Sequence, residues 1–171
     1  MCNLGLHIFH GTCYRWLHID RENDMSTTEY LIEREIVIDA PVEVVWRTIT
    51  EPDQISLWFA DKVDVEITPG ATGYLGFGDQ GGPVLVETVE PPSRFSFRWN
   101  HPAGEEPAAG NSLLVDFTLV AEGERTRLRV AESGLDPLPW PDADKQRYAE
   151  EHNEGWGEFL ERLLRLLGDK A

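Results

Sequence analysis

The sequence predicts an α+β fold: a curved antiparallel sheet of about seven strands against one long C-terminal helix, with two short helices after the first strand. Two patterns indicate this fold. Seven short segments alternate apolar and polar residues, as strands with one buried face do. The last segment, about residues 142–167, instead repeats large apolar residues every three or four positions, as an amphipathic helix does. With its helices on one side of the sheet, the chain fits the α+β class.

The first strand and the helices that follow it are marked by isoleucines and prolines. Residues 30–39 place Ile32, Ile36 and Ile38 on one face and acidic residues on the other. Pro41 follows at a position that suits the first turn of a helix. Pro52 suits the same position in a second short helix, so we expect two helices before the chain returns to strands.

Six more strands are expected between the short helices and the long helix. The turns between them are rich in glycine and proline, including Pro69-Gly70 and residues 79–82. Residues 122–124 join two alternating segments and indicate a hairpin. The expected strands are residues 62–68, 72–78, 83–90, 94–101, 111–121 and 125–132.

The long helix carries one stripe of bulky side chains that requires a wide partner surface. The sheet supplies such a surface, and the space between the two is either a packed core or a cavity. The stripe consists of Tyr148, His152, Trp156, Phe159, Leu160, Leu163 and Leu167.

Length and charge exclude several classes of function. A chain of 171 residues is expected to form one domain. Its net charge of −16 argues against nucleic acid and against anionic membrane surfaces, because both would repel it. No apolar run approaches the roughly 20 residues of a membrane span. We therefore expect a cytoplasmic protein. The negative charge is expected to serve solubility, and the alternative is an acidic face that docks a basic partner.

The first 24 residues differ in composition from the rest of the chain. They hold both cysteines and three of the five histidines, and they show neither helical nor strand periodicity. Met25 then precedes a clean strand, so we expect residues 1–24 to be a disordered or non-native extension and residues 25–171 to be a single domain. The spacing of His7, His10 and Cys13 lacks a second pair of metal ligands, and we predict neither a metal nor a cofactor.

A series of short motifs runs in a fixed order from about residue 29 to residue 167. The motifs are Arg34-x-Ile36-x-Ile38-x-Ala40-Pro41-x-Glu43-x-Val45-Trp46, Thr50-x-Pro52, Trp58, Pro69-Gly70, Val84 to Pro92, Phe97-x-Trp99 and His152-x-x-Gly155-Trp156-x-x-x-Leu160-x-x-Leu163. Together they resemble START-like helix-grip (SRPBCC) proteins, and more narrowly the branch of homologues of the activator of heat-shock-protein-90 ATPase. The resemblance implies a helix-grip fold with a cavity between the long helix and the sheet. It implies no fixed reaction, because this fold hosts lipid carriers, polyketide cyclases, hydrolases, ring-oxygenase subunits and cochaperone domains.

The aromatic residues of this small domain are the candidates for a ligand-binding cavity. Such cavities are lined mainly by apolar and aromatic side chains with few polar groups. The alternative is a fully packed core, since each aromatic side chain buries about 150–250 Å² wherever it lies. The predicted ligand-binding residues are Trp58, Phe59, Phe77, Val86, Phe97, Trp99, Phe117, Val130, Tyr148, His152 and Trp156.

Two residues could supply polar chemistry to that cavity. His152 lies one turn before Trp156 on the inward stripe, where an imidazole could orient a polar ligand group or transfer a proton. The alternative is a histidine bonded to a strand carbonyl. Glu132 ends its strand in phase with Val130, and a carboxylate beside His152 would suggest acid–base catalysis. Chance proximity of the two residues, or a solvated Glu132, is nevertheless the expected arrangement, and Arg34 is expected in a surface ion pair.

Three functions are compatible with the sequence. We favour binding of a small hydrophobic molecule in the cavity. The alternatives are a cochaperone-like module that acts on a chaperone ATPase in a stress response, and a cyclase or hydrolase of a polyketide-like substrate. The sequence holds no serine-hydrolase, zinc-protease or phosphate-loop motif, so enzyme status stays open. A monomer or a homodimer is expected.

Overall fold

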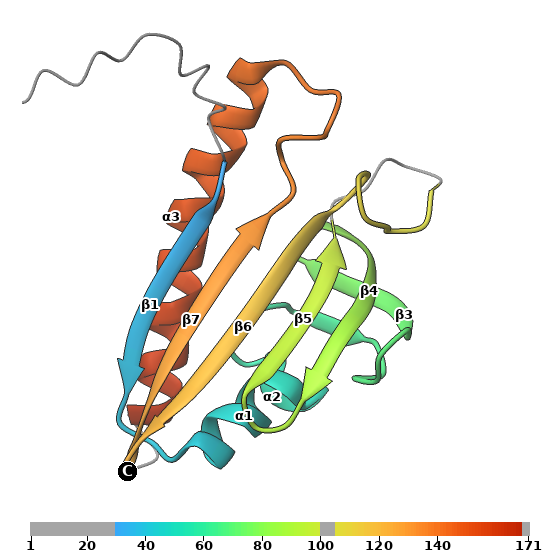
Figure 1. The fold of residues 1–171 in the computed structure, drawn as a ribbon. Coiled ribbons are helices and arrows are strands. Elements are labelled where there is room, and N and C mark those ends of the chain that lie inside the picture. The colour runs from blue at the N-terminus through green and yellow to red at the C-terminus, as the bar shows by residue number, and fades with distance from the viewer. Residues whose placement is uncertain (1–29, 100–104, 169–171) are drawn as a thin grey trace, which may run out of the picture.

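The computed structural model describes residues 30–99 and 105–168, which form a seven-stranded antiparallel sheet with three helices (Figure 1). The predicted fold class is thereby confirmed. The predictions made for residues 1–24 lie outside the described residues, so the division into an extension and one domain stays a prediction. The elements are β1 (Ile32–Ile38), α1 (Val42–Thr50), α2 (Pro52–Ile55), β2 (Lys62–Asp64), β3 (Thr72–Phe77), β4 (Gln80–Glu90), β5 (Arg94–Trp99), β6 (Leu113–Glu122), β7 (Arg125–Ser133) and α3 (Asp142–Gly168).

The order of the strands places the two ends of the domain side by side. The sheet runs β1-β7-β6-β5-β4-β3-β2, so the first strand pairs with the last and only α1 and α2 connect the two edges. The helix α3 lies along β1 and β7, while β3 and β4 curl away at the other side (Figure 1). The concave face of the sheet is therefore covered by α3 at one side and by α1 and α2 at one end. None of the helices in the described part of the chain is long and apolar enough to span a membrane.

Two predicted strand boundaries are wrong. The segment predicted as a strand over residues 62–68 pairs with β3 only over Lys62–Asp64. It then crosses β3 so closely that a β-carbon on Gly73 would collide with Asp64 and Val65, and it turns Val65 and Ile67 into the core. The turn predicted at residues 79–82 is tighter than expected, because β4 already starts at Gln80. Gly78 makes this turn possible with a φ of 59°, which other residues rarely adopt.

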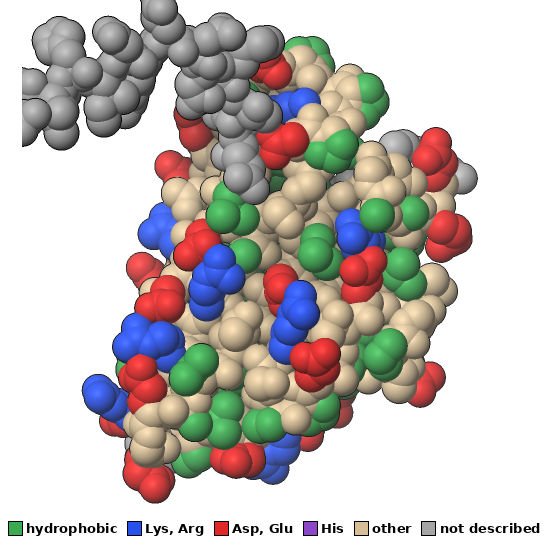
Figure 2. Space-filling view, viewed as in Figure 1, with side chains coloured by type: hydrophobic (Ala, Val, Ile, Leu, Met, Phe, Trp, Pro, Cys, Tyr) green, Lys and Arg blue, Asp and Glu red, His purple; other side chains and the backbone are tan. Residues whose placement is uncertain are grey.

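The outer face of the sheet carries ion pairs between neighbouring strands. Figure 2 shows acidic and basic side chains interleaved across this face. Arg98 points outward and pairs with Glu87. Among the residues that the structure describes, Arg34 has no acidic partner, contrary to the prediction. It donates hydrogen bonds to the Oδ1 and the carbonyl oxygen of Asn153, at 2.9 and 3.2 Å, and so joins β1 to α3. The remaining pairs are Arg129–Glu33, Arg127–Glu35, Arg127–Glu122 and Arg94–Asp116.

A buried hydroxyl secures the connection between β1 and α1. Thr126 is fully buried and donates a hydrogen bond of 2.8 Å to the carbonyl oxygen of Ala40. Replacing Thr126 by valine keeps the shape but leaves this carbonyl without its partner. We expect the free energy of unfolding to fall by about 1–2 kcal/mol. Urea denaturation measures the change, and the solvated Thr72→Val is the matched control, expected to change stability little.

Candidate ligand site beside a buried glutamate

The most unusual polar group of the domain is the side chain of Glu132, which is only 1% exposed. Its Oε1 accepts hydrogen bonds from Nε1 of Trp99 at 2.8 Å and from the hydroxyl of Tyr148 at 2.9 Å. Its Oε2 accepts a hydrogen bond from Nε1 of Trp156 at 2.8 Å and lies 3.0 Å from Nδ1 of His152. Four groups thus surround one buried carboxylate, which offsets the cost of removing it from water.

The position of Glu132 follows from the alternation of β7. Leu128, Val130 and Glu132 share the concave face, and Glu132 pairs laterally with Ile32 of β1 and Val115 of β6. The carboxylate therefore lies in the interior of the sheet and not at an edge. The strand ends one residue later at Ser133. Gly134 follows it, and its φ of 103° and close approach to the carbonyl oxygen of Ser112 both favour glycine.

His152 lies between this carboxylate and solvent. Its side chain is 25% exposed, and its ring stacks on Tyr148 with the ring centroids 3.7 Å apart. Trp99 packs against the same ring in a T-shaped arrangement, at a centroid distance of 5.7 Å. Because Glu132 can only accept a bond when it is ionised, the contact favours the tautomer with a proton on Nδ1. In that tautomer Nε2 carries the lone pair and is available to a ligand.

His152 and Trp99 form part of the wall of an open cleft of about 630 Å³ between α3 and the β3–β4 hairpin. The cleft joins aromatic rings from β3, β5 and α3 with the polar side chains of Asp79, Gln80 and His152. Its lining residues are Tyr74, Leu75, Phe77, Asp79, Gln80, Gly81, Gly82, Pro83, Val84, Trp99, His152 and Phe159. Glu132 lies directly behind this wall, one hydrogen bond away from it.

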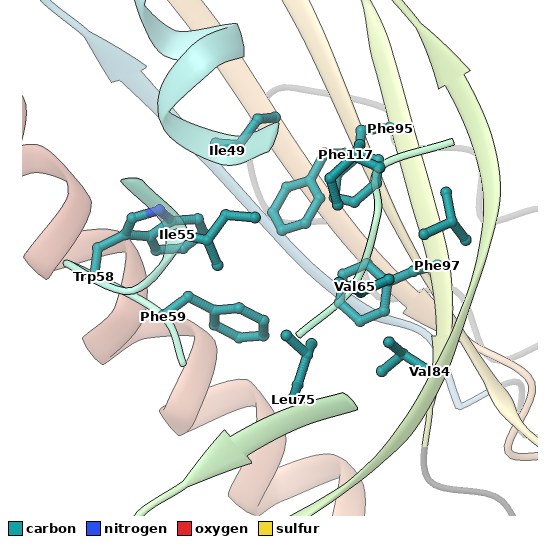
Figure 3. Close-up of a pocket in the computed structure, with 12 residues that line it drawn as sticks. Ile49, Ile55, Trp58, Phe59, Val65, Leu75, Val84, Phe95, Phe97 and Phe117 are labelled. Atoms are coloured by element: carbon teal, nitrogen blue, oxygen red, sulfur yellow. The ribbon is translucent and has the colours of Figure 1, made fainter. Parts of the chain in front are cut away.

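The interior beneath α1 and α2, in contrast, is nearly filled. Side chains there converge on a cavity of about 20 Å³, which is room for about one water molecule (Figure 3). Phe59 stacks on Trp156 with ring centroids 5.2 Å apart, and neighbouring aromatic rings pack around this pair. The residues that line this small cavity are Ile49, Ile55, Trp58, Phe59, Val65, Ile67, Leu75, Val84, Val86, Phe95, Phe97 and Phe117. In this part of the domain the aromatic residues form a packed core.

The predicted ligand-binding residues therefore fall into three groups. Phe77, Trp99 and His152 line the open cleft. Tyr148 contacts His152 but lines a separate hollow of about 360 Å³ beside Trp140 and Arg147. The remaining predicted residues are buried in the core: Trp58, Phe59, Val86, Phe97, Phe117, Val130 and Trp156. A role in binding stays a prediction for all of them.

Sequence reasoning was wrong about Glu132 and missed several cleft residues. Glu132 is buried, not solvated, and its Oε2 lies 3.0 Å from Nδ1 of His152; the strand parity that placed it in phase with Val130 was the correct signal. Gly82 belongs to the cleft because it shares the inner face of β4 with Val84, but it was expected in a turn. Within residues 30–99 and 105–168 no cluster of His, Cys, Asp or Glu is suited to a metal ion.

Three solved structures share this architecture. DynU16, a protein of the dynemicin biosynthetic locus, is 29% identical to this chain with a TM-score of 0.67. The match covers 82% of this chain and 48% of DynU16, so this chain spans about half the length of DynU16. MLL2253 from Mesorhizobium loti is 27% identical with a TM-score of 0.70, covering 82% of this chain and 98% of its own. The Aha1 dimer from Colwellia psychrerythraea is 22% identical with a TM-score of 0.63, covering 80% of this chain and 95% of its own, a similarity of fold alone.

Sequence comparison at the level of families gives a clear result. No curated protein matches the chain individually. The family model for activator of Hsp90 ATPase homolog 1-like proteins matches residues 39–168, from the end of β1 to the end of α3. This span contains the glutamate, the histidine and every residue that lines the cleft. The chain therefore belongs to the family of activator of Hsp90 ATPase homolog 1-like proteins.

Proposed function

We propose that this protein binds a small, largely aromatic molecule in the cleft between α3 and the β3–β4 hairpin. The observation that carries the proposal is the cleft itself, whose volume of about 630 Å³ lies within the range of small-molecule sites. Aromatic rings from β3, β5 and α3 line it, together with the polar side chains of Asp79, Gln80 and His152. The sequence led us to expect this site between the long helix and the sheet. The aromatic rings in that space, such as Phe59 and Trp156, pack against one another, and the open cleft lies next to this packed core.

The ligand would gain most of its affinity from burying apolar surface against Phe77, Trp99 and Phe159, at roughly 25 cal/mol per Å². His152 would fix its orientation. With Nδ1 engaged by Glu132, Nε2 accepts a hydrogen bond, so the ligand group that meets it carries a hydroxyl or a comparable donor. The proposed ligand class is therefore a flat aromatic molecule with a hydroxyl group.

Gly82 offers a direct way to close the cleft. A β-carbon at this position would meet no atom within 4 Å, and it would share the inner face of β4 with Val84. Replacing Gly82 by tryptophan should fill the cleft and weaken ligand binding at least about tenfold, the effect of losing about 1.4 kcal/mol. Fluorescence titration with 1-naphthol measures binding, and naphthalene, which lacks the hydroxyl, should bind more weakly.

Val120→Trp is the matched control for this experiment. Val120 is 51% exposed on the outer face of the sheet, so the same indole is added far from the cleft. This variant should bind 1-naphthol as the natural sequence does. Equal affinity in both variants would place the ligand elsewhere, and absence of binding across a panel of hydroxylated aromatic compounds would contradict the proposal. Native mass spectrometry of the purified protein provides a second readout through any co-purifying ligand.

The other sequence-based hypotheses stay predictions. A cochaperone-like role agrees with the name of the family, but the described surface offers no feature that favours one partner. A cytoplasmic location and a role in a stress response are likewise predictions. A cyclase-like activity is favoured by one specific observation, the contact between His152 and Glu132, which leads to the inference below.

A further inference from the structure

We infer that His152 and Glu132 make the cleft a catalyst of proton transfer, with His152 as the base and Glu132 as the residue that positions it. The substrate class is an aromatic compound with a C–H bond acidified by two neighbouring carbonyl groups, a 1,3-dicarbonyl. The inference rests on the proposed function, because the substrate occupies the same cleft as the proposed ligand. It goes beyond binding by assigning a reaction to the site.

The hydrogen bonds around Glu132 fix its role. Trp99 and Trp156 each supply an N–H group that can only donate, and they donate to different oxygens of the carboxylate. Tyr148 donates to the first of these oxygens, and His152 lies against the second. A protonated carboxyl group would carry an O–H donor on one of its two oxygens. Each oxygen already receives a hydrogen bond from at least one N–H or O–H donor, so this O–H group would face another donor. The arrangement therefore suits the ionised carboxylate.

An ionised carboxylate behind an imidazole assists the imidazole as a base. It holds the proton on Nδ1 and leaves the lone pair of Nε2 free. Among the described residues no hydrogen-bond partner contacts this nitrogen. When Nε2 accepts a proton, the resulting positive charge lies beside the buried negative charge of Glu132, which stabilises it. The stacked ring of Tyr148 and the edge of Trp99 keep the imidazole from rotating.

The composition of the cleft decides what this base can act on. Of its twelve lining residues in the described chain, none is a serine, threonine or cysteine. The pair thus has no serine, threonine or cysteine to activate, as a hydrolase that forms an acyl-enzyme on one of these residues would require. The base can instead act on the ligand directly. Gln80 and Tyr74 also line the cleft and carry donors that could bind a carbonyl oxygen.

The reaction step is enolisation. Nε2 of His152 takes the proton from the carbon between the two carbonyl groups, so a C–H bond breaks and an N–H bond forms. The electron pair of the C–H bond forms a C=C bond with the carbonyl carbon, and the π electron pair of that carbonyl moves to its oxygen, which gives an enolate. His152 then returns the proton to that oxygen, which produces the enol, or to the carbon, which restores the substrate. No oxidant, reductant or second reactant is consumed.

The test uses 1-phenylbutane-1,3-dione, an aromatic 1,3-dicarbonyl whose keto and enol forms differ in ultraviolet absorbance. The full-length protein should accelerate the relaxation between these forms after dilution into water, and it should accelerate exchange of the central hydrogens with D₂O. His152→Gln should lower this rate by about 10²-fold or more, the typical contribution of a general base. Binding of naphthalene, which makes no hydrogen bond to His152, should stay within a few-fold in this variant, because the cleft and its rings remain.

Glu132→Gln separates positioning from structural support. It should lower the turnover number while leaving the Michaelis constant nearly unchanged, whereas a purely structural role would change both or neither. Val120→Trp should retain the rate. A natural protein that binds 1-naphthol but does not accelerate enolisation would overturn this inference and leave the proposed function standing. A rate that survives in His152→Gln would also overturn it, and failure of both binding and catalysis would overturn both proposals.

Discussion

Replacing Glu132 by alanine should lower the free energy of unfolding by about 3–5 kcal/mol, the cost expected when one partner of a buried polar cluster is removed. The substitution leaves the indole N–H groups of Trp99 and Trp156 without acceptors in the interior. Each unsatisfied buried donor costs about 1–3 kcal/mol. The carboxylate no longer has to be desolvated, which offsets part of this loss. Urea denaturation followed by circular dichroism measures the change.

Glu132→Gln is the matched control for the alanine variant. Glutamine has the same shape as glutamate, and its one oxygen can still accept hydrogen bonds. Its NH₂ group replaces the second carboxylate oxygen and would face the donors that bind that oxygen in the natural protein. We expect an intermediate loss of about 1–2 kcal/mol. If alanine costs less than 1 kcal/mol, the hydrogen bonds around Glu132 do not organise this part of the fold.

Replacing Trp156 by alanine should be comparably severe. The side chain is 2% exposed, stacks on Phe59 and packs edge-on against Phe117 at a centroid distance of 5.7 Å. Truncation of a buried tryptophan leaves a large cavity and typically costs about 3–5 kcal/mol. It also removes the donor that contacts Oε2 of Glu132. The lost stability should appear as a lower midpoint in urea and a lower melting temperature.

Two control variants divide this loss into its parts. Trp156→Phe keeps most of the aromatic packing and removes the N–H donor, so it should cost less than the alanine variant by at least 1 kcal/mol. Trp140 lies only half-buried in the loop before α3, and Trp140→Ala should change stability less than Trp156→Ala. If Trp156→Ala and Trp140→Ala lowered the free energy of unfolding equally, the large contribution of Trp156 to the packing of the core would be contradicted.

The elements of this fold could be predicted because each follows from local patterns. Alternation predicted the seven strands, and the three- and four-residue spacing predicted α3 to within one residue. The segment after Asp64 was predicted incorrectly because Val65 and Ile67 continue the alternation. Their burial instead depends on a crossing over Gly73, where the absence of a side chain permits close approach. Such a crossing involves residues separated in sequence and leaves no periodic signal.

The site was only partly predictable for the same reason. Helix phase placed His152 inward, and strand parity placed Glu132 inward, but their separation of 3.0 Å depends on how α3 lies across β7. Aromatic composition was compatible with a cavity and with a core, and the packing of Phe59 against Trp156 decides for a core there. The cleft itself arises where β3 and β4 curl away from α3, a consequence of sheet curvature that the sequence does not display directly.

The protonation of the His152 ring tests the central claim of this account most directly. Long-range ¹H–¹⁵N correlation spectra distinguish the two neutral tautomers of histidine, and comparison with His152→Gln assigns the signals of this ring. At a pH where the ring is neutral, the contact with Glu132 predicts a proton on Nδ1 and a free lone pair on Nε2. A ring protonated on Nε2 would contradict the account, because it would leave the cleft facing a donor and Glu132 facing a lone pair.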